Sequence, residues 1–305
     1  MKRIFKSKYF SLIYIVLVFF FVIRYIHYEW ENFNSSLIRI APVYILLSFA
    51  LLFLHYLFKY YNWYLITKFN NCNLNLKETI FTKSISEVGK YIPGKIWIYL
   101  YLLKVYRSNN ISNGQVVICA YYEFIISIFS IIFYILYCLL WNPSFLDINM
   151  FLDDQLIILI FVIMLIIVQP KILNSILRIR FIRRRVSLIV DLSFSHIIFL
   201  IHLYVINIFI FSLSVYSLTY SLYPDINTFL IFYLGFAYYL ASLIGFISIF
   251  SPAGLGVREA SFIYFLFNLL PQSIIGIVSL LLRFSLLIVE FSLFGISYFH
   301  KLYNK

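Results

Sequence analysis

Runs of about 20 apolar residues, bounded by polar clusters, constrain this 305-residue chain more than any other feature of its sequence. The hydrocarbon core of a bilayer is about 30 Å thick, so a helix needs about 20 apolar residues to cross it. Apolar residues make up 63% of the chain and charged residues 12%, which leaves too little polar surface for a water-soluble globule. The sequence therefore predicts an all-α, polytopic integral membrane protein with about eight transmembrane helices plus a re-entrant helical hairpin. The eight runs are residues 9–26, 40–58, 116–140, 154–168, 195–220, 228–250, 257–270 and 273–299, of which the fourth and seventh are short enough to stop partway or re-enter.

The basic residues predict the orientation of these spans. A basic stretch precedes the first run without a small-residue cleavage site after it, which indicates an uncleaved span with its N-terminus in the cytoplasm. Loops that alternate sides from this start place 21 of the 24 Lys and Arg in the cytoplasm, and both termini with them. The net charge of +12 is then a record of topology. The basic tract at 178–185 is interpreted as a loop on anionic headgroups rather than an RNA site, so no nucleic-acid partner is expected.

The segment 76–107, between the second and third runs, is too apolar for a simple cytoplasmic loop. Its sequence predicts two short helices separated by Gly89-Lys-Tyr-Ile-Pro-Gly-Lys95, since Gly suits the residue after a helix and Pro the first residue of the next. A re-entrant hairpin would place this break in a cavity, with Lys90 and Lys95 beside the free N–H groups that attract an anion such as phosphate. The alternative is a surface-lying amphipathic helix followed by a ninth span.

A second break, Ser251-Pro-Ala-Gly-Leu-Gly-Val-Arg-Glu259, lies between the sixth and seventh runs. Glu259 suits the positive end of the next helix dipole, but Arg258 does not, so Arg258 needs an anionic headgroup or a carboxylate from another helix as its partner. Two interrupted apolar segments, one in each half of a chain, are a pointer to a transporter's binding site.

Charged residues within apolar segments are rare and usually functional, and four stand out: Glu87, Glu123, Arg283 and Glu290. Arg283 and Glu290 are two helical turns apart on one face of the last span, so they either bind successive partners along one groove or pair with other helices for assembly. Catalytic motifs such as GxSxG, HExxH and the P-loop are absent from the sequence. The three cysteines have no metal-ligand spacing, so we expect no metal and no cofactor.

At the two breaks the sequence resembles the lysylphosphatidylglycerol synthase transmembrane region, also described as the flippase-like domain family. The resemblance is carried by Gly89-Lys-Tyr-Ile-Pro-Gly-Lys-Ile-Trp97 with Asn110-Ile-Ser112, and more specifically by Pro252-Ala-Gly-Leu-Gly-Val-Arg-Glu259. It covers essentially the whole chain and implies a single flippase-like membrane domain over residues 1–305. Many members carry an arginine in the helix after the first break, where residues 99–101 here are Tyr-Leu-Tyr.

In bifunctional members this membrane domain translocates an aminoacylated phospholipid that a C-terminal cytosolic transferase domain makes. The chain ends at Lys305, directly after the last span, so we expect that transferase domain to be absent and the protein to move lipid rather than synthesise it.

Together the residues and the resemblance predict a lipid translocase or lipid-binding transporter in the bacterial cytoplasmic (inner) membrane, for a phospholipid or a lipid-linked envelope precursor. Its expected partners are membrane lipids and envelope-biosynthesis enzymes. The alternatives are a membrane-embedded transferase in envelope lipid or polysaccharide biosynthesis and a non-catalytic scaffold for such enzymes. Glu259 or Glu123 is expected either to counter a cationic headgroup or to position the basic residues. The residues expected to bind the headgroup or its phosphate are Lys90, Pro93, Gly94, Lys95, Pro252, Gly254, Gly256, Arg258 and Glu259.

Overall fold

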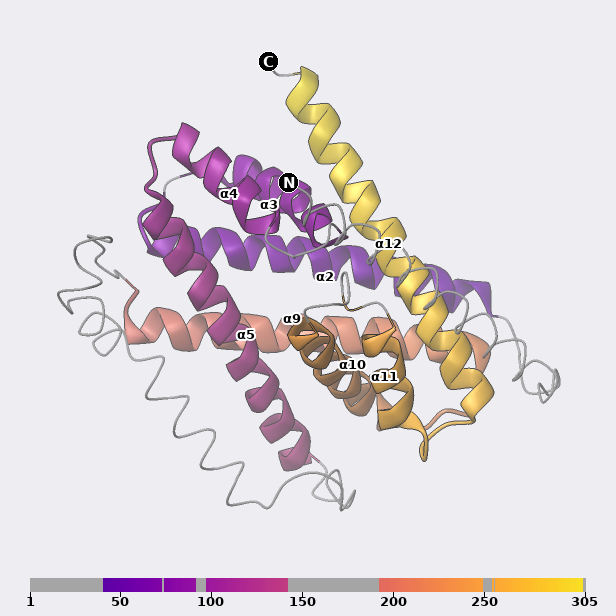
Figure 1. The fold of residues 1–305 in the computed structure, drawn as a ribbon. Helices are drawn as coiled ribbons and strands as arrows, with labels where there is room; N and C mark the ends of the chain where they lie inside the picture. Colours follow the sequence, from indigo (N-terminus) through magenta and orange to yellow (C-terminus); the bar gives the residue numbers. More distant parts are fainter. Residues whose placement is uncertain are drawn as a thin grey trace, which may run out of the picture. The chain divides into compact units, whose positions relative to one another are not determined.

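The computed structural model describes residues 41–72, 74–91, 97–141, 192–248, 254 and 256–303, and every regular element in them is a helix (Figure 1). The predicted spans at 9–26 and 154–168 and the basic tract at 178–185 lie outside the described residues. The elements are α2 (Pro42–Phe69), α3 (Leu76–Glu87), the 3₁₀ turn η2 (Val88–Tyr91), α4 (Trp97–Ser108), α5 (Asn113–Trp141), α9 (Phe194–Leu222), α10 (Leu230–Ile247), α11 (Val257–Leu266) and α12 (Gln272–Tyr303).

Five of the described helices, α2, α5, α9, α10 and α12, are at least 18 residues long and apolar enough to cross a membrane. Each coincides with a predicted run, which confirms the all-α, multi-pass membrane class. The predicted short run at 257–270 becomes α11, whose ten residues rise about 15 Å, half the thickness of the hydrocarbon core. The helix α11 by itself therefore stops partway.

Contacts group the described chain into two compact units, whose boundaries fall inside α2, α3, α4 and α9. Unit 1 takes the chain up to Tyr56, residues 84–101 and the chain from Phe209 onward, and unit 2 takes residues 57–83 and 102–208. In unit 1 the hydroxyls of Ser48 (α2) and Ser214 (α9) lie 3.0 Å apart, α10 packs on α11, and α11 packs on α12. Small hydroxyl residues are suited to such contacts because they let helices approach closely and hydrogen-bond across the interface.

Unit 2 is held by aromatic and hydroxyl contacts between its helices. The Trp63 indole N–H donates to the Tyr106 hydroxyl at 3.0 Å, which joins α2 to α4. The Ser130 hydroxyl of α5 donates to the Ile126 carbonyl of its own helix at 2.7 Å and also lies 3.3 Å from the Ile201 carbonyl of α9. These bonds give buried polar groups partners that lipid does not provide.

The predicted helix–break–helix pattern of the first interrupted segment is present. The helix α3 ends at Glu87, η2 follows, and α4 begins at Trp97, while residues 92–96, with Pro93, Gly94 and Lys95, lie outside the described residues. Gly89 is required for a different reason from the one its sequence position predicts. It does not adopt a positive φ, but a Cβ there would lie 2.8 Å from the backbone nitrogen of Ile98, so the start of α4 packs directly on it.

The polar face of α3 is its buried face. Lys83 is 2% exposed, whereas Leu76 at the start of the apolar stripe is 41% exposed. A helix lying on a membrane surface would turn its polar side to water, so this burial argues against the surface-lying alternative. The same helix face carries the buried residues Thr79, Thr82, Lys83, Ser86 and Glu87.

The second break packs tightly on α10. Gly254 and Gly256 have φ angles of 72° and 80°, a backbone region that side chains with a Cβ rarely adopt. A Cβ at Gly254 would also lie 3.2 Å from the Cα of Gly245, which is buried in α10. The two glycines therefore allow the chain to turn into α11 while it touches the preceding helix.

We predict that Gly254→Ala lowers the free energy of unfolding by about 1–2 kcal/mol, the cost of the left-handed backbone, with the close contact to Gly245 adding to it. The matched control is Gly295→Ala in α12, where a Cβ would meet nothing within 4 Å and alanine favours the helix by up to about 1 kcal/mol. Thermal unfolding of the two purified variants in detergent measures the difference. Equal melting temperatures would contradict the packing described for this break.

Candidate functional site

The first break meets the last span at Glu290. This carboxylate of α12 is 3% exposed and accepts hydrogen bonds from the Lys90 ammonium, the Tyr91 hydroxyl and the Tyr56 hydroxyl of α2. The Glu87 carboxylate lies 3.8 Å from the same ammonium. A buried carboxylate is costly unless it is paired and hydrogen-bonded, and here three donors from two segments of unit 1, α2 and η2, satisfy it.

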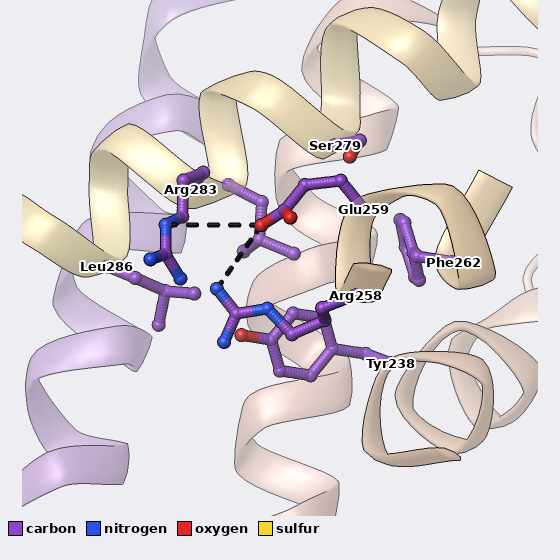
Figure 2. Close-up of a pocket in the computed structure, with 8 residues that line it drawn as sticks. Tyr238, Arg258, Glu259, Phe262, Ser279, Arg283 and Leu286 are labelled. Carbon is purple, nitrogen blue, oxygen red and sulfur yellow. Dashed lines mark hydrogen bonds and ion pairs between the residues drawn. The ribbon is translucent and has the colours of Figure 1, made fainter. Parts of the chain in front are cut away.

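The second break meets the last span at Glu259. One oxygen of its carboxylate accepts from the Gly256 N–H at 2.7 Å, which caps the start of α11. The other oxygen lies 3.4 Å from Nη2 of Arg258 and 3.9 Å from Nε of Arg283. Figure 2 shows the Glu259 carboxylate joined by dashed lines to both guanidinium groups. The anionic partner that Arg258 was expected to need is thus its own neighbour in the chain.

Aromatic rings flank the three cations of this site. The Arg258 guanidinium lies 5.3 Å from the ring centre of Tyr238 in α10, and the Arg283 guanidinium lies 5.7 Å from that of Tyr91. The Lys90 ammonium lies 5.3 Å from the Tyr91 ring. Such contacts lower the cost of burying a cation, because a ring face carries partial negative charge. Arg283 and Glu290 therefore pair with the two breaks from one face of α12.

The formal charges of the described residues at the two breaks sum to zero, which limits how these residues can bind a phosphate. Each of the cations there already has a carboxylate partner, so a phosphate that binds one of these cations must displace that carboxylate. We name this set the break cluster. It comprises Lys90, Arg258 and Arg283 with Glu87, Glu259 and Glu290.

A small hollow lies beside the second break, with a cavity volume of about 10 Å³, about the room that one water molecule needs (Figure 2). Its volume is below the roughly 300 Å³ at which pockets for whole small molecules begin. It is lined by Tyr238, Arg258, Glu259, Phe262, Ser279, Leu282, Arg283 and Leu286.

Sequence reasoning missed the tyrosines of the site. Tyr56 and Tyr238 are two of 27 tyrosines and carry no distinguishing pattern, whereas Tyr91 lies inside the first break motif and could have been singled out. Burial, followed by the neighbouring Glu290 carboxylate, raises the pKa of the Tyr91 hydroxyl well above its usual range. Tyr91 therefore stays protonated, and its hydroxyl donates a hydrogen bond to Glu290.

The other predicted charge, Glu123, belongs to unit 2. Its carboxylate accepts from the Lys83 ammonium at 2.7 Å, and that ammonium lies 4.2 Å from the Trp63 ring centre. Within unit 2 this pair is a buried structural contact between α3 and α5. The described residues hold no group of three or more His, Cys, Asp and Glu that could bind a metal. Of the predicted headgroup residues, Pro93, Gly94, Lys95 and Pro252 lie outside the described part of the chain.

We predict that Lys83→Met lowers the free energy of unfolding by about 2 kcal/mol, because it leaves the Glu123 carboxylate without its buried cation. Lys77→Met is the matched control, since Lys77 is exposed on the same helix. Adding Glu123→Gln to Lys83→Met should recover part of the loss. Thermal unfolding of the three variants tests this, and a double variant less stable than Lys83→Met would refute the pairing.

Comparison with known proteins places the chain in a family. A model of the family described as "Lysylphosphatidylglycerol synthase TM region" matches residues 10–293, a range that contains both breaks and, in α12, Arg283 and Glu290. Comparison with curated proteins and with solved structures finds no match. The chain belongs to the lysylphosphatidylglycerol synthase transmembrane-region family and is a multi-pass membrane domain associated with lipid-related processes of the cell envelope.

Proposed function

We propose that this protein carries a lipid headgroup across the bacterial cytoplasmic membrane, as a translocase or lipid-binding transporter for a phospholipid or a lipid-linked envelope precursor. The observation that supports this most directly is the break cluster. Two helix interruptions, one in each half of the chain, meet buried charges of the last span inside an otherwise apolar unit. A headgroup needs polar partners at depth, whereas its acyl chains can stay in the bilayer.

The pairing in the cluster provides a way to take up a phosphate. Breaking a buried ion pair is costly when nothing replaces the lost partner. A phosphate that binds Lys90 replaces the carboxylate with another anion, and Glu290 keeps its bonds from Tyr56 and Tyr91. A phosphate can replace Glu259 at Arg258 in the same way, because the Glu259 carboxylate keeps its hydrogen bond from the Gly256 N–H. The cluster therefore favours opening when an anionic headgroup is present.

The rival function is a membrane-embedded transferase, which needs a carboxylate able to act as a base. Glu259 and Glu290 are both engaged by donors in the described structure, which makes them better suited to ion pairing than to proton abstraction. The structure thus favours transport over chemistry at this cluster.

We predict that the purified protein in liposomes accelerates transbilayer movement of a headgroup-labelled phospholipid, measured by an impermeant quencher. Lys90→Gln should slow this movement about tenfold or more, because it removes a charge-assisted contact to the phosphate. Lys301→Gln is the matched control, since Lys301 is exposed near the end of α12 and its ammonium contacts only the Tyr101 hydroxyl among the described residues.

The lipids are then extracted and separated by chromatography. Movement without chemical change supports the transporter, and a new lipid product supports the transferase. If neither lipid movement nor a new lipid product is seen, the scaffold role is the alternative that remains. If the folded Lys90→Gln and Arg258→Gln variants move lipid at the wild-type rate, the break cluster is not the transport route.

A further inference from the structure

We infer that Arg283 of α12 forms a binding site for a phosphodiester oxyanion in the hollow beside the second break. This deepens the proposed function and rests on it for the source of the oxyanion, a lipid headgroup. Sequence reasoning assigned phosphate binding to Lys90, Lys95 and Arg258 and left Arg283 between a functional and an assembly role. The structure separates Lys90, Arg258 and Arg283 by how well each is hydrogen-bonded.

Arg283 is buried without the hydrogen bonds that such a group requires. The residue is 8% exposed, and within the described chain its Nε and Nη2 donate to no acceptor. The nearest carboxylate oxygen, on Glu259, lies 3.9 Å from Nε, close enough for attraction but too far for a hydrogen bond. Buried polar groups are nearly always hydrogen-bonded, so two unpaired donors on one buried guanidinium call for an acceptor.

The position of these donors identifies where the acceptor would lie. Arg283 lines the hollow together with Ser279, one helical turn earlier on α12, and with Arg258 and Tyr238 across from it (Figure 2). The remaining lining is largely apolar, from Phe262 and two leucines, which limits competition from water. The hollow is too small for a whole headgroup, and the side chains that line it must move apart for one phosphate group to enter.

The charge of the hollow matches a phosphodiester. Two arginines and one carboxylate line it, so its described lining carries one surplus positive charge, although the break cluster as a whole is neutral. A phosphodiester carries one negative charge. The planar guanidinium of arginine presents parallel N–H donors that fit two phosphate oxygens at once, which lysine cannot do.

The test measures ligand-induced stabilisation in neutral detergent, so it is independent of transport. Phosphatidylglycerol in mixed micelles should raise the melting temperature of the wild-type protein, and diacylglycerol, which lacks the phosphate, should not. Arg283→Gln should weaken the phosphatidylglycerol effect by about tenfold or more in apparent affinity. Arg283→Lys, which keeps the charge but loses the paired donors, should fall between the two. Arg107→Gln is the matched control, because Arg107 is exposed on α4.

A second readout distinguishes ligand binding from a structural role. The Nε and Nη2 of Arg283 make no hydrogen bond, and Glu259 keeps the Gly256 N–H and Arg258 without it, so Arg283→Gln should leave the melting temperature of the lipid-free protein unchanged or higher, whereas a structural arginine would lower it. Full phosphatidylglycerol stabilisation of Arg283→Gln, or a lower melting temperature of the lipid-free variant, would overturn the site. Equal stabilisation by inorganic phosphate alone would overturn its assignment to a lipid. Binding that persists without transbilayer movement would support this site while the proposed function fails.

Discussion

The pairing of buried charge is the constraint on which unit 1 depends. Lipid offers no hydrogen bonds, so each ionised group at depth must find its partners in the protein. Glu290 finds three, and in doing so joins α2, the first break and α12. Glu259 joins the start of α11 to α12 in the same way. These two carboxylates link the irregular segments of the chain to its regular helices.

Irregular backbone in a membrane protein requires protein around it, and the glycines show how closely it is packed. At Gly89 the start of α4 occupies the place of a side chain, and at Gly254 the preceding helix α10 does so. The two breaks therefore do different things with the same residue type. The first uses glycine for close approach alone, while the second also uses it for a left-handed turn.

A neutral cluster with a local surplus of charge is well suited to a headgroup that must bind and then leave. Full neutrality keeps the empty site stable in an apolar surrounding. The hollow at Arg283 keeps one guanidinium without hydrogen bonds, which gives an arriving oxyanion a partner before any existing pair is broken. Under the proposed function, Lys90 and Arg258 would then exchange their carboxylate partners for the phosphate at lower cost.

The helices and their interruptions could be predicted from the amino-acid order alone, because hydropathy, prolines and glycines act locally. Five described spans and both breaks lie where the apolar runs and the Gly/Pro motifs predict them. Only the tertiary structure decided which charges pair. Lys90 and Tyr56 reach Glu290 across 200 and 234 residues of chain, and no local pattern encodes contacts at such separations. The burial of the polar face of α3 and the lack of hydrogen bonds at Nε and Nη2 of Arg283 also depend on which helices pack around them.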